Sequence, residues 1–371
     1  MVAKVTVLAG VLAALLVVSA SANATSKAWV VETSPPPDQA GSVHLNSVTM
    51  VPGSAGQEAW AFGSNEVTAG SFAPVVQHRT GGVWTNVPDT VPGTYTRLTG
   101  GVALGTSSVW AVGSYISNKQ IRPLAEHWNG SAWKLARVPK AGKESAFNAV
   151  AISGTTGWAV GQQEVEGNGS PLIEAVEGST WTIDGSLTTS PYNTNLLGVC
   201  QVPGTDEAWT VGTSNNTATF AAHYDGTNWV QVATPTVGTT DRLYAVACIG
   251  ADDVWAVGQT FQTGIGYQPL IEHWDGSDWT VVSAPTFAQG AGLYGITAVP
   301  SSSRLWAVGV AKRHGADVPL IERWTGTAWR NVASPALTCD SQLNAVAGAI
   351  GQTLQAVGEQ CQDDALTERY Q

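Results

Sequence analysis

The stretch from Leu243 to Val282 decides the fold, and it holds four apolar segments separated by polar turns: Leu243-Tyr-Ala-Val-Ala, Val254-Trp-Ala-Val-Gly, Pro269-Leu-Ile-Glu-His-Trp and Trp279-Thr-Val-Val. These segments are too short for helices and are rich in β-branched and aromatic residues, so each predicts a β-strand. The turn Asp275-Gly-Ser-Asp supplies the glycine that a tight hairpin needs. One stretch therefore predicts four short antiparallel strands.

The same unit occurs seven times along the chain. Its marker is Trp-Ala-Val-Gly or a close variant, which begins at Trp60, Trp110, Trp158, Trp209, Trp255, Trp306 and Gln355. Successive markers lie 50, 48, 51, 46, 51 and 49 residues apart. Four-stranded units at a period of about 40 to 50 residues are typical of propeller blades. We therefore predict an all-β, seven-bladed β-propeller with four antiparallel strands in each blade.

The two ends of the repeat array complement each other. Trp29-Val-Val-Glu-Thr-Ser-Pro is an isolated fourth segment, whereas the chain stops at Tyr370-Gln371, directly after a third segment. A ring of blades must be closed against opening, and pairing the first strand with the last blade would close it. We expect Trp29 to Thr33 to form the outermost strand of the blade made by Leu343 to Tyr370.

The beginning of the chain predicts export. Residues 1–24 contain Lys4, an apolar run from Val5 to Val18 and the small-x-small site Ala22-Asn23-Ala24, which is the pattern of a cleaved signal peptide. We expect residues 25–371 to form a single propeller domain of a secreted, extracellular protein. The alternative is an uncleaved membrane anchor, but the run is shorter than the roughly 20 residues that span a bilayer. We therefore expect no stable membrane insertion.

Composition and spacing exclude several classes of partner. The formal net charge is -11 and only 12% of the 371 residues are charged. Such a chain repels polyanions, so we expect no nucleic-acid partner. Metal-site spacings, Gly-rich phosphate loops and Gly-x-Ser-x-Gly elbows are absent from the sequence. We predict no metal, no cofactor and a monomeric protein.

The four cysteines fall into two pairs of different character. Cys339 and Cys361 lie in two connections of the last blade that emerge on one face, which favours a disulfide that reinforces the closing blade. Cys200 and Cys248 lie in adjacent inner strands but not in equivalent positions. We expect these two to be buried thiols.

Most aromatic, histidine and glutamate side chains recur once in each unit, which indicates a role in the framework. All 16 tryptophans fall in the repeat frame. The third segment repeats a histidine at positions 78, 127, 223 and 273, and a glutamate at positions 126, 174, 272, 322 and 368. Packing and internal hydrogen bonds explain such periodic residues better than sugar stacking, metal binding or catalysis do.

Specificity is expected in the connections, because these vary while the frame does not. In propellers the connections between blades, and those between the second and third strands, emerge on one face, called the top. The candidate ligand-binding residues there are Arg97, Arg122, Arg242, Tyr267, Phe287, Arg313 and His314. We place Arg97 and Arg242 near the mouth of the central channel, where their guanidinium groups would bind an anionic or hydroxyl-rich ligand. Tyr267 and Phe287 would stack against it.

The Trp-Ala-Val-Gly strand followed by His273-Trp-Asp-Gly-Ser-Asp-Trp resembles a repeat of secreted bacterial propellers. It is also distantly similar to the Kelch and galactose-oxidase propeller repeat, although this chain has one glycine where Kelch units have a pair. The resemblance covers the whole mature chain and implies the propeller fold. Because one fold serves many functions, it implies no particular ligand.

Two functions of different classes follow from this reasoning. The first is an extracellular binding module whose top face holds a glycan or another protein. The alternative is an atypical carbohydrate-active enzyme, either a glycoside hydrolase or a sialidase-like protein. That enzyme would use acidic residues of the top connections: Glu66, Glu164, Glu166, Asp363 and Asp364. A copper radical oxidase would need several free histidines, and only His44 and His314 lie outside the frame. We therefore favour binding over catalysis.

Overall fold

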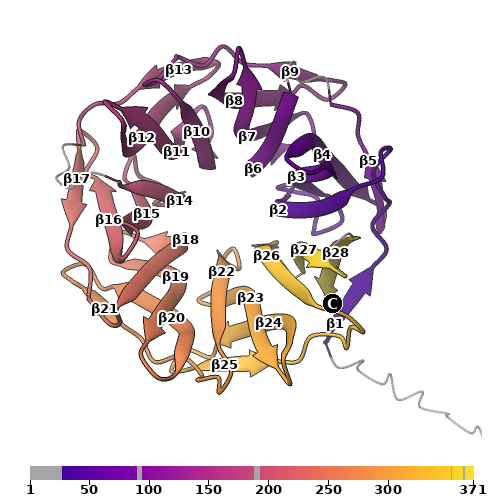
Figure 1. Ribbon diagram of the computed structural model, residues 1–371, viewed down its shortest axis with the longest axis vertical. Helices are drawn as coiled ribbons and strands as arrows, with labels where there is room; N and C mark the ends of the chain where they lie inside the picture. Colours follow the sequence, from indigo (N-terminus) through magenta and orange to yellow (C-terminus); the bar gives the residue numbers. More distant parts are fainter. Residues whose placement is uncertain (1–26, 90–93, 188–192, 352, 362–363) are drawn as a thin grey trace, which may run out of the picture.

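The computed structural model describes residues 27–89, 94–187, 193–351, 353–361 and 364–371. These form a ring of seven four-stranded antiparallel sheets around a central channel (Figure 1). Each sheet is a blade, and we name its strands a to d from the channel outward. The predicted signal peptide lies outside the described residues. Within the described part of the chain, no helix has the length and apolar character needed to cross a membrane.

The strands follow the repeat frame blade by blade. Blade 1 comprises β2 (Ser42–Met50), β3 (Ala59–Thr68), β4 (Ser71–Thr80) and β5 (Val83–Asn86). Blade 2 comprises β6 (Thr94–Gly105), β7 (Ser108–Ser117), β8 (Gln120–Trp128) and β9 (Trp133–Leu135). Blade 3 comprises β10 (Ser145–Ser153), β11 (Thr156–Val165), β12 (Asn168–Glu177) and β13 (Thr180–Ile183). Blade 4 comprises β14 (Asn195–Gln201), β15 (Ala208–Ser214), β16 (Ala218–Tyr224) and β17 (Trp229–Val232).

The remaining three blades complete the ring. Blade 5 comprises β18 (Thr240–Gly250), β19 (Asp253–Gln262), β20 (Gly266–Trp274) and β21 (Trp279–Val281). Blade 6 comprises β22 (Ala291–Ala298), β23 (Leu305–Arg313), β24 (Ala316–Trp324) and β25 (Trp329–Val332). Blade 7 comprises β26 (Ser341–Gly348), β27 (Leu354–Gln360), β28 (Asp364–Tyr370) and, as its outermost strand, β1 (Trp29–Glu32).

The ring closes as the complementary chain ends predicted. β1 pairs antiparallel with β28, from Trp29 opposite Tyr370 to Glu32 opposite Thr367. Figure 1 shows the C-terminus beside β1, so the first and last strands of the chain share one blade. The prediction of seven blades closed by the N-terminal strand is thereby confirmed.

The two inner strands differ in burial, although both are rich in apolar residues. Strand b is buried along its apolar run, as in Ala59 to Gly63 of β3. Strand a alternates between buried and half-buried residues, as in β2. The difference arises because strand a lines the channel, so that every second side chain meets this space instead of the neighbouring blade.

Tryptophans join neighbouring blades through one repeated contact. The strand b tryptophan of each blade packs against the strand d tryptophan of the next, for example Trp60 on Trp133 at a centroid distance of 5.5 Å and an interplanar angle of 88°. The same contact joins Trp110 to Trp181, Trp158 to Trp229, Trp209 to Trp279, Trp255 to Trp329 and Trp306 to Trp29. Edge-to-face geometry of this kind is the favoured arrangement of aromatic pairs.

The recurring histidines pack against the rings of these tryptophans. His78 stacks on Trp60 at 4.0 Å, and its Nε2 hydrogen-bonds Oε1 of Glu58 at 2.8 Å. His223 and His273 repeat both contacts, with Glu207 and Asp253 as their partners. His127 stacks on Trp110 and bonds the hydroxyl of Ser108. The periodic histidines are thus occupied within their own blades.

The seventh boundary replaces aromatic packing by a buried ion pair. Blade 7 has Gln355 at the strand b tryptophan position. Blade 1 has Arg79 where blade 3 has Val176 and the other five blades have a tryptophan or tyrosine. Arg79 is fully buried, and it donates from Nη2 and Nε to the two carboxylate oxygens of Glu32 at 2.7 and 2.8 Å. Trp84 Nε1 also donates to Glu32, at 3.1 Å. Glu32 of β1 therefore fastens the closing blade to blade 1.

Five strand c glutamates are buried in the blades: Glu126, Glu174, Glu272, Glu322 and Glu368. Burial is the main cause that raises their pKa, from 4.5 to about 9 for Glu126, to about 8 for Glu174, Glu272 and Glu322, and to about 7 for Glu368. The charge of Asp89 contributes further at Glu126. These carboxyl groups therefore keep their protons in the folded chain well above the pH at which the unfolded chain releases them.

Two disulfides fix the inner strands and the last blade. One joins Cys339 to Cys361 across the top of blade 7, with Cα atoms 5.1 Å apart. The other joins Cys200 of β14 to Cys248 of β18, with Cα atoms 5.7 Å apart. The prediction of buried thiols at Cys200 and Cys248 was wrong. The two cysteines meet because neighbouring inner strands are offset by one residue. Thr49, opposite Trp60, contacts Ala103, opposite Val109, and Cys200, opposite Trp209, contacts Cys248, opposite Val254, in the same way.

We expect Glu32→Gln to lower the free energy of unfolding by about 3 to 5 kcal/mol, because it leaves the buried Arg79 guanidinium without its counter-charge. Urea unfolding followed by tryptophan fluorescence measures the change. Glu207→Gln, which removes a partly exposed partner of His223, should cost less than about 1 kcal/mol. Equal losses in the two variants would contradict the special role of the closing pair.

The buried glutamates make stability depend on pH. Between about pH 4.5 and 9 the folded state holds more protons than the unfolded state, so the free energy of unfolding falls as the pH rises through this range. Glu272→Gln, which cannot ionise, should flatten this decline and raise the melting temperature at pH 8 to 9. The exposed Glu177→Gln should leave the profile unchanged. Melting curves from pH 4.5 to 9 test the expectation, and identical slopes for all three proteins would contradict it.

Candidate binding site at the channel mouth

Every inner strand contains a β-bulge at the same place. In β2 the ladder register skips one residue between Leu45 and Ser47, and each of the other inner strands skips at the equivalent point. A bulge leaves one residue outside the ladder and re-aims its side chain. The seven skipped residues line a cavity of 240 Å³ on the ring axis: Asn46, Thr99, Asn148, Leu197, Tyr244, Tyr294 and Asn344.

Four of the bulge side chains join neighbouring blades by hydrogen bonds. Asn344 Nδ2 donates to the carbonyl of Leu45 at 2.9 Å, and Asn46 Nδ2 donates to the carbonyl of Leu98 at 2.9 Å. Thr99 Oγ1 donates to Phe147 at 2.8 Å, and Asn148 Nδ2 donates to Leu196 at 2.7 Å. From blade 7 through blade 4, the inner strands are thus linked by one repeated side-chain contact.

The next three bulges, in blades 4, 5 and 6, lack this contact. They hold Leu197, Tyr244 and Tyr294, whose aromatic pair lies edge to face with centroids 5.4 Å apart. Among the described residues, no side chain donates to the carbonyls of Leu243, Leu293 and Leu343, and neither tyrosine hydroxyl makes a hydrogen bond. This side of the channel therefore presents carbonyl acceptors, two phenols and an apolar surface.

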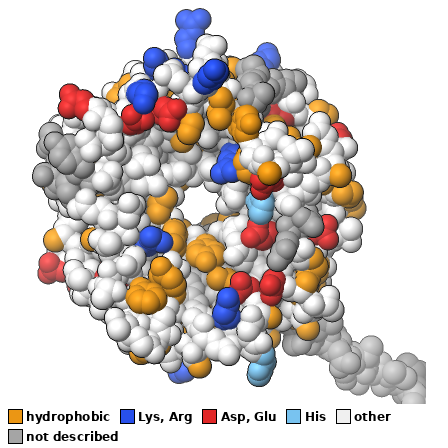
Figure 2. All heavy atoms as spheres, viewed as in Figure 1, with side chains coloured by type: hydrophobic (Ala, Val, Ile, Leu, Met, Phe, Trp, Pro, Cys, Tyr) orange, Lys and Arg blue, Asp and Glu red, His pale blue; other side chains and the backbone are white. Residues whose placement is uncertain are grey.

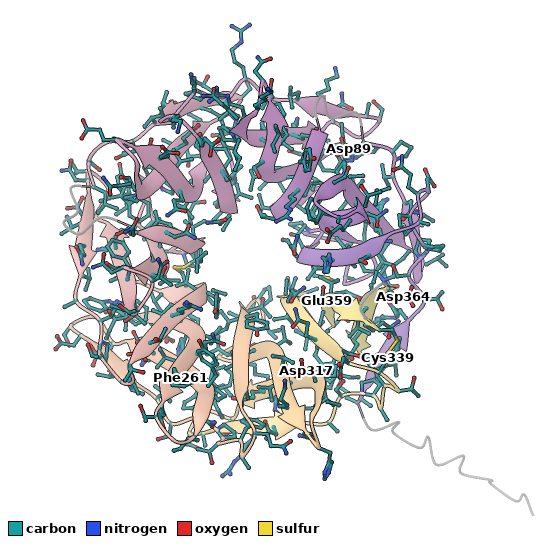
Figure 3. The ribbon with its side chains drawn as sticks, in the orientation of Figure 1. Asp89, Phe261, Asp317, Cys339, Glu359 and Asp364 are labelled. Atoms are coloured by element: carbon teal, nitrogen blue, oxygen red, sulfur yellow. A yellow bond between two sulfur atoms is a disulfide. The ribbon has the colours of Figure 1, made fainter. Side chains whose placement is uncertain are left out.

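The Tyr294 hydroxyl stays protonated over the whole physiological range. Burial raises the pKa of Tyr294 to about 12, and the negative charges that Tyr244, Asp317 and Glu359 can carry add to the shift. In Figure 3, Glu359 lies beside the central opening and Asp317 lies farther out. Tyr294 can therefore both donate and accept a hydrogen bond at the channel.

The rim above the bulges carries charge of both signs. Two residues before the skipped position, the inner strands hold His44 in blade 1, Arg97 in blade 2 and Arg242 in blade 5. His44 Nδ1 pairs with the carboxylate of Glu359 across the boundary between blades 7 and 1, and this hydrogen bond raises the pKa of His44. Figure 2 shows the opening as a hollow with charged side chains around it.

The two predicted rim arginines have different environments. The Arg97 guanidinium lies over the Phe72 ring, with Cζ 3.6 Å from the ring centroid, and the side chain is exposed. Arg242 is half-buried, and its Nη2 makes only a long contact of 3.4 Å with the carbonyl of Asn216 in blade 4. Arg242 lies on the strand that carries Tyr244. Among the described residues, its other N–H groups make no hydrogen bond, and they lie at the aromatic side of the channel.

The other predicted residues lie away from the channel. Arg122 of β8 donates to the carbonyl of Lys143 at 3.0 Å and to Gln120. Tyr267 is 38% exposed and packs edge to face on Phe261 of β19. Phe287 packs against the hydrophobic cluster between blades 5 and 6. Its backbone N–H and carbonyl bond the side chain of Gln268 at 2.9 and 2.8 Å.

Arg313 and His314 lie at the tip of blade 6, in a connection that the sequence analysis took for a variable loop. The connections between strands b and c are instead β-hairpins. In blade 2 the ladder continues from Gly113 to the pair of Ser117 with Gln120, and a two-residue turn closes it. His314, with φ 53°, and Gly315 close blade 6 in the same way. The polar residues of these connections do not end the ladder, because polar residues can continue strand pairing as well as apolar ones. Residues with positive φ then close the hairpin with a two-residue turn.

The acidic residues considered for catalysis are dispersed over three blades. Glu66 of blade 1 accepts a hydrogen bond from the N–H of Gly70 at 2.8 Å. Glu164 of blade 3 pairs with Lys143 at 3.1 Å, and Asp364 begins β28 in blade 7. Asp363 lies outside the described residues. Within the described ranges, no group of three or more His, Cys, Asp and Glu side chains could hold a metal ion.

A second cavity, of 460 Å³, lies in the top half of blade 1 between Pro37, Asn65, Pro74 and Asp89. Its lining ends at Asp89, which precedes the undescribed residues 90–93.

Solved structures share this fold at low sequence identity, whereas no protein-family model and no curated protein matches the chain. A structure of YCF48 bound to a D1 peptide has a TM-score of 0.59 and 12% identity, over 92% of this chain and 96% of that chain. A lectin of the fungus Aleuria aurantia, a six-bladed propeller that recognises fucose, has a TM-score of 0.52 and 13% identity, over 79% and 96%. These likenesses support the propeller fold.

Sequence reasoning missed Leu197, Tyr244 and Tyr294. The signal was available, because the residue after the inner-strand Leu or Phe is Asn or Thr in four units and Leu or Tyr in the other three. Without the bulge, that position cannot be assigned to the channel.

We expect Tyr244→Asn to stabilise the protein by about 0.5 to 1.5 kcal/mol, because it restores an amide donor to the Leu293 carbonyl. Asn46→Ala should destabilise it by a similar amount, since it removes the bond to Leu98. Chemical denaturation measures both. Opposite signs support the bulge contacts as links between blades, and two destabilised variants would contradict that role at blade 5.

Proposed function

We propose that this chain is a secreted binding module that holds one sugar ring of a glycan at the channel mouth of its top face. The observation that carries the proposal is the interruption of the bulge contacts in blades 4 to 6. Among the described residues, three side-chain hydrogen bonds between blades are missing there, and the cavity is bordered instead by carbonyls without a side-chain donor and by two phenols.

The chemistry of this side of the channel suits a hydroxyl-rich ring. Sugar hydroxyls both donate and accept, so they match the carbonyls of Leu293 and Leu343 and the hydroxyls of Tyr244 and Tyr294. A tyrosine ring offers a face against which the apolar side of a sugar packs. The cavity of 240 Å³ is smaller than the roughly 300 to 1,000 Å³ of pockets for drug-sized ligands, which favours a single ring.

The rim would bind the next part of the ligand. The Arg242 guanidinium lies two residues before Tyr244 on the same strand and offers planar, charged donors to hydroxyl or carboxyl groups. The peptide bound to YCF48 and the fucose recognised by the fungal lectin show that propellers serve as binding modules for either ligand class. The hydroxyl-matching groups at this channel favour the sugar.

Export also forms part of the proposal. All four cysteines are in disulfides, which persist in oxidising compartments and are rare in the cytosol. Together with the signal-peptide pattern of residues 1–24, this supports a secreted protein.

We expect a glycan array probed with the mature chain to give hits that Tyr244→Ala and Arg242→Ala weaken about tenfold to a hundredfold. Arg242→Ala removes a charge-assisted contact of about 1.5 to 3 kcal/mol, and Tyr244→Ala removes both a hydroxyl and the ring face on which a sugar would pack. Tyr267→Ala, which removes an exposed tyrosine of the same face outside the channel, should bind normally.

Tyr267→Ala is the control that shows whether the ligand binds at the channel. If Tyr267→Ala loses binding and Tyr244→Ala keeps it, the ligand lies on the hairpins instead of the channel. Binding to a peptide library but to no glycan would overturn the sugar proposal.

A further inference from the structure

On the bottom face, each blade repeats a pair of side chains where strands b and c face each other. The pair consists of the residue two positions before the strand b tryptophan and the strand c residue opposite that tryptophan. In blades 1, 4 and 5 it joins an acid to a histidine: Glu58 to His78, Glu207 to His223 and Asp253 to His273. The repeated pair is thus complementary in charge when the histidine is protonated.

Blade 6 departs from this pattern, because both positions hold arginine. The acid position holds Arg304 and the histidine position holds Arg323, opposite Trp306. Arg323 also lies opposite Arg330 of β25, so three arginines occupy one corner of the blade. Among the described residues, none of the three has a carboxylate within ion-pair distance. In a chain of net charge -11, with 17 lysines and arginines in total, this cluster is a local exception.

Arg304 and Arg323 line one cavity of 250 Å³ together with Ser303 and the turn from Trp324 to Gly326. The Arg323 guanidinium lies over the Trp306 ring, with Cζ 5.6 Å from the centroid. Stacking of this kind holds the guanidinium plane while its N–H edges remain available. The exposed Ser303 hydroxyl makes no hydrogen bond to the described residues and adds a neutral donor.

We infer that this corner of blade 6 is a binding site for a tetrahedral oxyanion, a sulfate or phosphate group carried by a ligand. Two like charges facing one cavity repel each other unless an anion lies between them. Arginine pairs bind such oxyanions through several N–H groups at once. The donors come from the turn between strands a and b, which holds Ser303 and Arg304, and from Arg323 of strand c, so they approach from more directions than a planar carboxylate can use.

The test uses inorganic sulfate and phosphate on the mature chain, with sodium chloride adjusted to keep the ionic strength constant. A ligand that binds only the folded state raises the melting temperature. We expect both anions to raise it in the unchanged protein and acetate to do so less. Arg304→Glu should weaken the affinity for sulfate at least about tenfold, the equivalent of one charge-assisted contact.

Arg304→Glu carries a second, independent expectation. It places an acid beside Arg323, as blades 1, 4 and 5 place one beside their histidine, so the variant should melt at a higher temperature than the unchanged protein when no sulfate is present. Arg137→Glu makes the same change of charge at an exposed residue of blade 2. It should keep the full response to sulfate.

The controls separate a site from a general salt effect, since sulfate also stabilises proteins by exclusion from their surface. An equal response to sulfate in the unchanged protein, Arg304→Glu and Arg137→Glu would overturn the inference. If Arg304→Glu does not fold, Arg304→Ser, which copies Ser108 of blade 2, replaces it with the same expected loss of affinity.

Discussion

The structure depends on the contact between the strand b tryptophan of one blade and the strand d tryptophan of the next. A single blade cannot bury both of its faces, so each is stable only between two neighbours. The contact recurs at six boundaries, from Trp60 on Trp133 to Trp306 on Trp29. At the seventh, Glu32 and the buried Arg79 take its place. Because an ion pair fits only its own partner, this boundary distinguishes the closing blade from the others.

At the channel, the contact between neighbouring blades is present at only some of the repeated positions. In four bulges the side chain donates a hydrogen bond to a carbonyl of the next blade, which links the inner strands from blade 7 through blade 4. Three bulges in succession do not, and Tyr244 and Tyr294 face the same space instead. Sites of function commonly forgo stabilising contacts in this manner. This side is joined instead by the Cys200–Cys248 disulfide between blades 4 and 5 and by the contact of the Tyr244 and Tyr294 rings between blades 5 and 6. Its carbonyl acceptors and phenols are the basis of the proposed binding site.

In a repeat protein the same position can be compared across blades, which distinguishes framework residues from exceptional ones. The histidine that stacks on the strand b tryptophan has an acidic partner in three blades, which marks it as framework. The same comparison isolates Arg304 and Arg323 on the bottom face. Phe287 illustrates the converse, since an aromatic residue in a top connection serves the core of blades 5 and 6.

The sequence by itself determined the number of blades, their four strands and the closure by Trp29 to Glu32, because these follow from local hydrophobic pattern and from the complementary ends of the array. Only the tertiary structure decided the pairing of Cys200 with Cys248 and the position of Tyr244 and Tyr294 in the channel. For the cysteines the physical reason is the one-residue offset between neighbouring inner strands, and for the tyrosines it is the bulge. One skipped residue moves every later side chain of a strand to the other face, and no periodicity in the sequence marks where the skip occurs.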